Sequence, residues 1–92
     1  RSDLPGVSFQ AVGLTDPRTY DTRIVRTGGD ESGIGSGMVL YTDRVTKSLV
    51  GVITYNVPDS FSVLNTARVL IINAMVLPDS DEKVVKIFSK KD

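Results

Sequence analysis

Short runs of β-branched and aromatic residues, separated by clusters of Gly, Pro, Asp and Asn, recur along most of this chain. This pattern is typical of β-strands joined by tight turns. In residues 7–12, for example, Val7, Phe9 and Ala11 fall on one side of a strand, with Ser8 and Gln10 on the other. With 92 residues, the chain has the length of a single β-rich domain with one core.

Four further segments are predicted to be strands. Residues 38–42 and 48–57 are β-rich and are separated by the polar residues 43–47, which predicts an antiparallel hairpin. Residues 19–27 alternate less clearly, which predicts an exposed strand at a sheet edge. Residues 69–77 are apolar at both odd and even positions, so we expect a strand covered on both faces.

Two segments fit either a helix or a strand. The stretch from Phe61 to Ala67 is expected to be an irregular lead-in to a strand, although its apolar residues also fit one face of a helix. From Asp81 to Phe88 the apolar residues have helical spacing after capping residues, and a final strand fits nearly as well. We therefore expect an all-β fold, a compact antiparallel sandwich or barrel of about six strands, with or without one short terminal helix. If both segments are helical, the fold is α+β instead.

Residues 28–37 contain five glycines in ten positions, and folding would have to remove much backbone entropy there. The spacing matches neither the dinucleotide-binding nor the P-loop motif, and Asp30 and Glu31 would repel a phosphate. We therefore predict a flexible loop suited to adapting to a partner.

The composition excludes several kinds of chemistry. The chain has no Cys and no His, which excludes disulfides, thiolate nucleophiles, Ser-His-Asp triads and most zinc sites. Asp79, Asp81 and Glu82 do not form the calcium-loop motif and fit a capped turn better. We assign no catalytic residue, no cofactor and no metal. The formal net charge of zero makes nucleic acid an unfavourable partner.

Charged residues are the candidates for contact with a partner. Arg18, Arg23 and Arg26 lie in one segment with Asp16 and Asp21, which predicts surface ion pairs more strongly than a binding patch. The lysines near the C-terminus form a modest cationic stripe, typical of a solvated helix face. The candidate partner-binding residues are Arg18, Arg23, Arg26, Asp30, Glu31, Lys86 and Lys90.

The leading hypothesis is a non-enzymatic interaction or assembly module, such as a coat, appendage or secreted recognition domain. It would act through β-edges and the Gly-rich loop, on a protein partner or on itself. One alternative is a small subunit or processed fragment of an enzyme, with its catalytic groups on another chain; a weaker one is an RNA-binding domain. Residues 1–6 lack a signal core and an initiating Met, so we expect a processed fragment. The longest apolar stretch is too short to span a membrane, and the compartment stays open.

Overall fold

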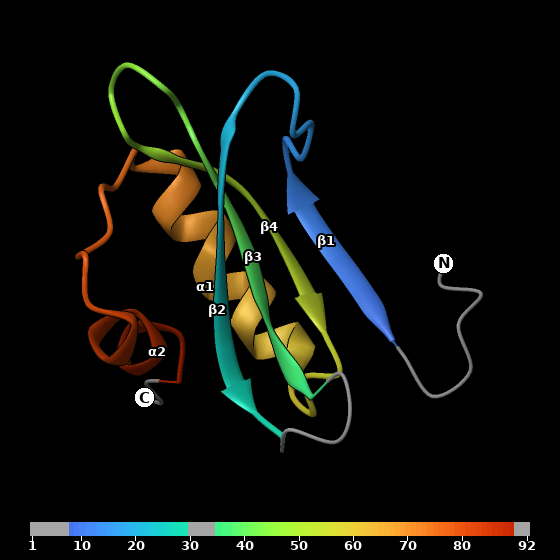
Figure 1. Cartoon of the computed structure of the whole chain (residues 1–92). Helices are drawn as coiled ribbons and strands as arrows, with labels where there is room; N and C mark the ends of the chain where they lie inside the picture. The colour runs from blue at the N-terminus through green and yellow to red at the C-terminus, as the bar shows by residue number, and fades with distance from the viewer. Residues whose placement is uncertain (1–7, 30–34, 90–92) are drawn as a thin grey trace.

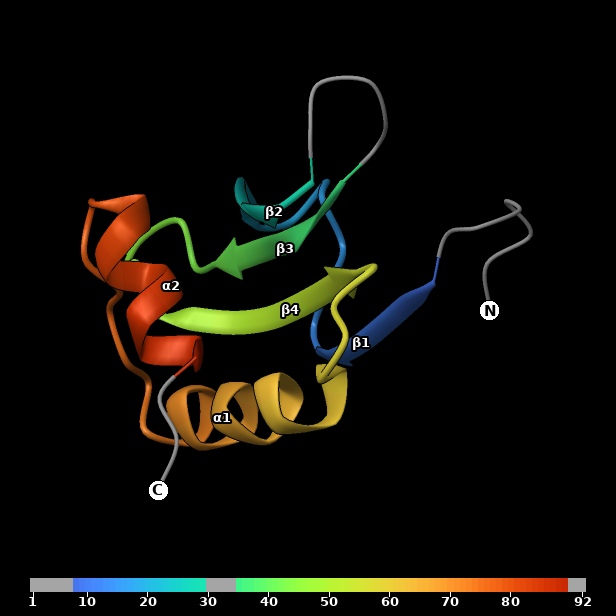
Figure 2. The ribbon, with the colours of Figure 1, turned by 90° about the horizontal axis from the view of Figure 1, so that it is seen from below.

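The computed structural model of the chain describes residues 8–29 and 35–89. Its strands and helices are β1 (Phe9–Gly13), β2 (Asp21–Gly28), β3 (Ser36–Thr42), β4 (Leu49–Tyr55), α1 (Ser60–Ile72) and α2 (Asp81–Ser89). The strands form one antiparallel sheet in the order β1-β4-β3-β2 (Figure 1). Both helices lie on one face of this sheet, and no described helix or strand covers the other face (Figure 2).

Strand alternation explains why one face carries the core. Val25 lies opposite Met38, and Leu40 lies opposite Val52, and all four side chains are buried on the helix-covered face. They form one cluster with Ala67 and with residues of α2. Burial of this apolar area is the main force that holds the helices on the sheet.

Strand β1 lies at the edge of the sheet farthest from β2, its neighbour in sequence. Residues 14–20 therefore cross from one edge to the other, as Figure 1 shows. The crossing begins with a hydrogen bond from the Leu14 N–H to the Val50 carbonyl at 2.9 Å. Gly51 lies directly beneath the Leu14 backbone, where a β-carbon would collide with the Leu14 carbonyl oxygen.

Helix α1 packs beneath β4 and β1. Leu64 and Ala67 are buried, and Leu70 and Ile71 are half-buried beside them, with helical spacing. The helix ends at Asn73, whose side-chain amide donates to the Val69 carbonyl at 2.8 Å. Beyond it, the chain returns to the sheet only as an isolated bridge between Val76 and Ser48.

Helix α2 begins with the capping residues that the sequence indicates. The Lys83 N–H donates to the Ser80 hydroxyl oxygen at 3.3 Å, and Asp81 lies in the first turn, where the helix dipole favours negative charge. Val84 and Phe88 are buried against the sheet and α1. The terminal helix is thereby confirmed.

The all-β prediction is wrong, because the fold is an open four-stranded sheet with two helices, the α+β alternative. The predicted strand over residues 69–77 is also wrong, since α1 continues to Ile72. Helical spacing places Leu64, Ala67 and Ile71 on one face against the sheet, and this burial outweighs the β preference of the branched residues. The hairpin of β3 and β4 and the edge position of β2 are confirmed.

Candidate functional site

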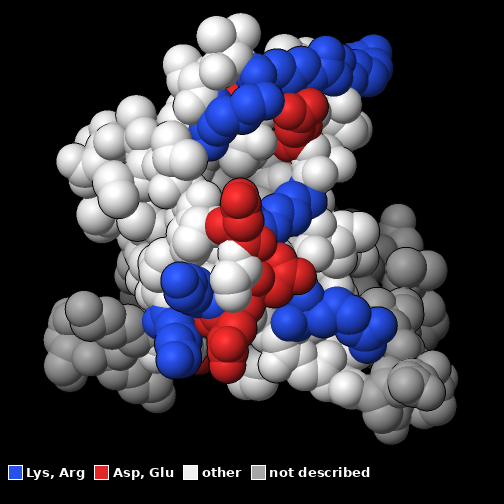
Figure 3. Space-filling model, turned by 60° about the vertical axis from the view of Figure 1, so that its left-hand side comes forward, with Lys and Arg blue, Asp and Glu red and all other residues white. Residues whose placement is uncertain are grey.

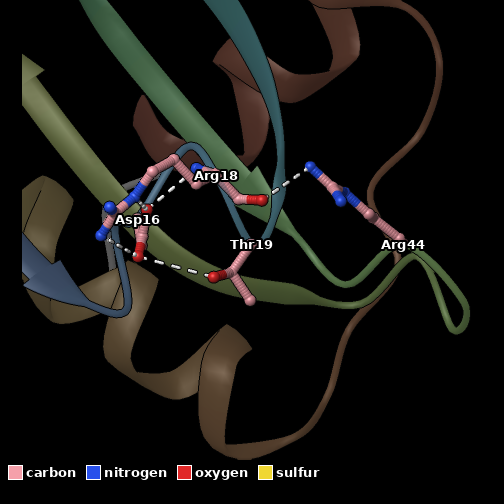
Figure 4. Close-up of polar contacts among 4 residues, drawn as sticks. All are labelled: Asp16, Arg18, Thr19 and Arg44. Carbon is pink, nitrogen blue, oxygen red and sulfur yellow. Dashed lines mark hydrogen bonds and ion pairs between the residues drawn. The ribbon is translucent and has the colours of Figure 1, made fainter.

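Arg18 lies in the crossing between β1 and β2 and is bound locally (Figure 4). Its Nε atom lies 3.2 Å from the Asp16 carboxylate, and its carbonyl accepts a hydrogen bond from Arg44 at 3.1 Å. The Arg18 side chain, together with its backbone N–H, lowers the pKa of Asp16 below its ordinary value. This is one of the local ion pairs that the sequence predicts, and it lies at the surface.

Arg23 connects β2 to the start of α2. Its guanidinium donates to the Asp81 carboxylate at 2.6 Å and to the carbonyls of Pro78 and Asp79 at 2.9 and 2.7 Å. The Arg23 side chain is 31% exposed, so these bonds are partly shielded from water. Its role in this fold is structural, and its ion-pair partner is Asp81 rather than an acidic residue of its own segment.

The three arginines are not brought into one patch. Arg23 and Arg26 are separated by an odd number of positions in β2, so they point to opposite faces of the sheet. The Arg26 guanidinium lies against Gly35. Lys86 lies on the exposed side of α2, remote in sequence from Arg18.

The remaining candidates, Asp30, Glu31 and Lys90, lie outside the described residues. Of the predicted Gly-rich loop, Gly28 ends β2, and Ser36 and Gly37 begin β3. In Figure 3, which brings the α2 side forward, blue and red side chains lie next to one another. Charge on this face is mixed and offers no extended basic surface.

The outer edge of β1 has the features of a binding surface. The Leu14 N–H and the Ser8 carbonyl both bond to the β4 side, so the even-numbered residues face β4 and the backbone groups of Phe9, Ala11 and Gly13 point outward. Strand β1 contains no charged residue and no proline. It therefore lacks the charges and the proline that often protect an edge strand from pairing.

The opposite edge, at β2, is covered and charged. Strand β2 contains three charged residues, Asp21, Arg23 and Arg26. Asp21 lies 3.5 Å from Arg44 and 3.9 Å from Lys47, while Arg23 holds residues 78–81 and α2 beside the strand. The two edges of the sheet thus differ, and only that of β1 is open to another strand among the described residues.

The uncovered face of the sheet carries an apolar row across all four strands. Ala11, Ile53, Val39 and Ile24 lie opposite one another in register. Ala11 and Ile24 are exposed, and the inner two are half-buried. Next to this row, the Tyr55 ring lies against Gly37, where a β-carbon would meet its hydroxyl oxygen.

Helix α1 also exposes a row of side chains, three of them apolar, which we call the α1 stripe: Phe61, Asn65, Arg68, Val69 and Ile72. Phe61, Val69 and Ile72 are 74%, 58% and 81% exposed. Within the stripe, the Arg68 guanidinium donates to the Asn65 amide oxygen at 2.7 Å. Lone exposed apolar residues are ordinary, but three on one helix are a candidate interaction surface.

A cavity of about 420 Å³ lies where both helices meet the end of the sheet, with mostly apolar walls. Met38, Val63, Val85 and Phe88 supply apolar lining, and Asp59 and several hydroxyl groups lie around it. It belongs to the packing of α2 on the sheet and lies on the side of α1 away from β1, because Val63 faces it while Ile71 faces Gly13.

The sequence predicts contacts through β-edges, but the candidate residues taken from it are all charged, and neither β1 nor the α1 stripe is among them. The edge of β1 and the α1 stripe are largely uncharged, and Val69 and Ile72 were expected in a buried strand. The signal in the sequence was that residues 60–72 contain more large apolar residues than one face of a helix can bury, so some of them must be exposed.

No group of three or more potential metal-ligating side chains occurs within residues 8–29 and 35–89. In the same ranges, no helix has the length and hydropathy needed to span a membrane. No known protein family matches this chain, and no curated protein is recognisably similar to it.

Proposed function

We propose that this chain is a non-enzymatic protein-binding module that pairs with a strand of its partner at the outer edge of β1. One observation carries the proposal: within residues 8–29 and 35–89, this edge is uncharged and uncovered, whereas the opposite edge at β2 is charged and lies beside residues 78–81 and α2. Natural sheets usually protect their edges, so an unprotected edge is a site for strand addition.

The chemistry of strand addition fits what β1 offers. The outward backbone groups of Phe9, Ala11 and Gly13 supply hydrogen bonds that do not depend on the partner's sequence. Specificity comes from side chains that flank the added strand. Phe9 and Ala11 lie on the uncovered face beside Tyr55 and Ile53, so the partner strand is expected to place apolar residues there.

The alternatives have less support in the described residues. Arg18 and Arg23, which an RNA-binding surface would need, are engaged with Asp16 and Asp81. The acidic residues of the enzyme-subunit hypothesis, Asp30 and Glu31, lie outside the residues that the structure describes. The charged groups thus support the fold, and the uncharged edge is left for binding.

Selection of short random peptides on the immobilised chain tests the proposal. Selected peptides are expected to be strand-forming, and N-methylation of alternate backbone nitrogens should abolish their binding. Ala11→Pro removes one outward N–H at the edge and should weaken binding at least tenfold, while Ala11→Val keeps that N–H and should bind normally. Peptides that bind equally well to the Ala11→Pro chain would contradict the proposal.

A further inference from the structure

We propose that the partner strand is β1 of a second copy, so that two chains form a symmetric dimer with one continuous sheet. This inference rests on the proposed function and specifies its partner. It follows from two features that lie side by side, the free edge of β1 and the α1 stripe. Each of them is complementary to itself when it meets a second copy in antiparallel orientation.

The register of the strand pair follows from which backbone groups point outward. Phe9, Ala11 and Gly13 must pair with outward residues of the second copy, and a two-fold axis at Ala11 satisfies all three. Phe9 then lies opposite Gly13 of the second copy. The sheet already contains such a contact, since the Tyr55 ring lies against Gly37. No like charges meet, because β1 carries none.

Helix α1 lies where it meets its counterpart in such a dimer. It packs under both β4 and β1, so its axis lies between these two strands. Neighbouring strands are about 4.8 Å apart, so the helix axis lies about 5 Å from the two-fold axis beside β1. Pairing at β1 therefore places the two α1 axes about 10 Å apart. Packed helices have axes separated by about 8–10 Å. Strand pairing and helix packing are therefore compatible in one interface.

The α1 stripe faces the required direction. The Ile71 side chain reaches Gly13 on the β1 side of the helix, whereas Val63 lines the cavity on the α2 side. At about 100° per residue, Phe61, Arg68 and Ile72 follow within about 100° of Ile71, on the side away from Val63. These three residues thus project on the β1 side, toward the position of a second copy, while Asn65 and Val69 lie farther round the helix, at about 120° and 160° from Ile71.

The stripe is also self-complementary. Phe61 and Ile72 are equally far from a point between residues 66 and 67, close to the middle of the helix, and so are Asn65 and Arg68. In antiparallel packing, Phe61 of one copy meets Ile72 of the other, and Arg68 meets Asn65. A stable interface buries about 800 Å² per partner, more than a five-residue strand edge supplies, so the stripe is an essential part of the contact.

Sedimentation velocity of the full chain over a concentration series tests the dimer. The mass is expected to rise from 10.0 kDa to twice that value as concentration increases. Ala11→Pro should abolish this rise, while Ala11→Val should leave it unchanged. Circular dichroism establishes that both variants are folded.

Opposite charges introduced at positions 61 and 72 of α1 test the register of the two helices, even if the proline variant fails to fold. Phe61→Lys alone and Ile72→Glu alone should each weaken dimerisation at least tenfold. The double variant should recover most of the affinity, because the introduced lysine of one copy meets the introduced glutamate of the other. Val45→Glu, in the exposed turn between β3 and β4, is the matched control and should dimerise normally.

The outcomes separate the two proposals. A chain that stays monomeric up to about 1 mM, a concentration at which even weak complexes form, overturns the dimer. If selected peptides still bind at β1, the proposed function stands and the second copy is not the partner. A dimer that persists in Ala11→Pro, or a double variant that stays monomeric, also overturns this inference.

Discussion

The guanidinium of Arg23 lies 2.6 Å from the carboxylate of Asp81, and this pair joins the middle of β2 to the first residue of α2. Two further bonds from Arg23, to the carbonyls of Pro78 and Asp79, fix the chain that leads into the helix. The Arg23 side chain thus attaches residues 78–81, which lead into α2, to the edge strand β2.

Replacing Arg23 with Ala should lower the free energy of unfolding by about 2 kcal/mol, because it leaves two carbonyls without their donor and frees residues 78–81. Asp81→Ala should cost less, about 0.5–1 kcal/mol, because this carboxylate is largely exposed. Urea unfolding of both single variants and the double variant measures their coupling. Equal effects of the two single changes would mean that the carbonyl bonds contribute nothing.

Gly51→Ala should destabilise the fold by about 2 kcal/mol or more, because the new β-carbon collides with the Leu14 carbonyl where the crossing leaves β1. Gly28→Ala is the matched control. There the nearest atom is the Ser36 hydroxyl oxygen, which can rotate away. Thermal unfolding should show a clearly lower Tm for the first variant alone. Similar Tm values for both would show that the Leu14 backbone moves freely.

Phe88→Ala should lower the free energy of unfolding by about 3–4 kcal/mol, since Phe88 is buried and its removal enlarges the cavity beside Met38. Phe61→Ala, an equal chemical change at an exposed position of α1, should cost under about 0.5 kcal/mol. Chemical unfolding should be measured at low protein concentration, because association would add to stability. A larger loss of stability for Phe61→Ala than for Phe88→Ala would show that α2 does not pack as described.

Stability should fall in acid through the carboxylate of Asp43. The N–H groups of Thr46 and Val45 donate to this carboxylate and lower its pKa below the ordinary value of 3.8, and the Arg18 side chain does the same for Asp16. A carboxyl whose pKa is lower in the folded state stabilises the fold above the unfolded pKa and loses this effect as the pH falls through the folded pKa. The decline should therefore begin near pH 4 and continue below it.

Asp43→Asn tests this assignment, because an amide oxygen can still accept both N–H bonds in the turn but does not titrate. Its free energy of unfolding should depend less on pH below about pH 4 than that of the unchanged chain. Between about pH 5 and pH 8 both should be nearly flat, since the chain has no His. An unaltered acid profile would assign the effect to other carboxylates.

Local signals in the sequence were sufficient for the hairpin, and for α2 they indicated a helix while leaving a final strand as an alternative. Residues 43–47 separate two β-rich runs, and Ser80 precedes a short amphipathic segment. Helix α1 was missed although Leu64, Ala67 and Ile71 have helical spacing. Phe61, Val69 and Ile72 add apolar residues outside that face, so the stretch resembles a strand buried on both sides.

The proposed binding surface was harder to predict than the fold. Strand β1 pairs with β4 rather than with its neighbour in sequence, and no local pattern specifies that pairing. Its uncharged edge is visible only once the strand order is known. The charged residues that the sequence singled out act mainly within the fold, as Arg18 and Arg23 show.

The position of β1 in the sheet also affects the order in which the strands pair during folding. Strands β2 to β4 and the two helices follow one another through short connections, whereas β1 must find a strand some forty positions later in the chain. Strands β2 to β4, which pair in sequence order, are thus expected to form early, and β1 is expected to join them late. The outer edge of the sheet at β1 is therefore completed only after the other strands and the two helices are in place.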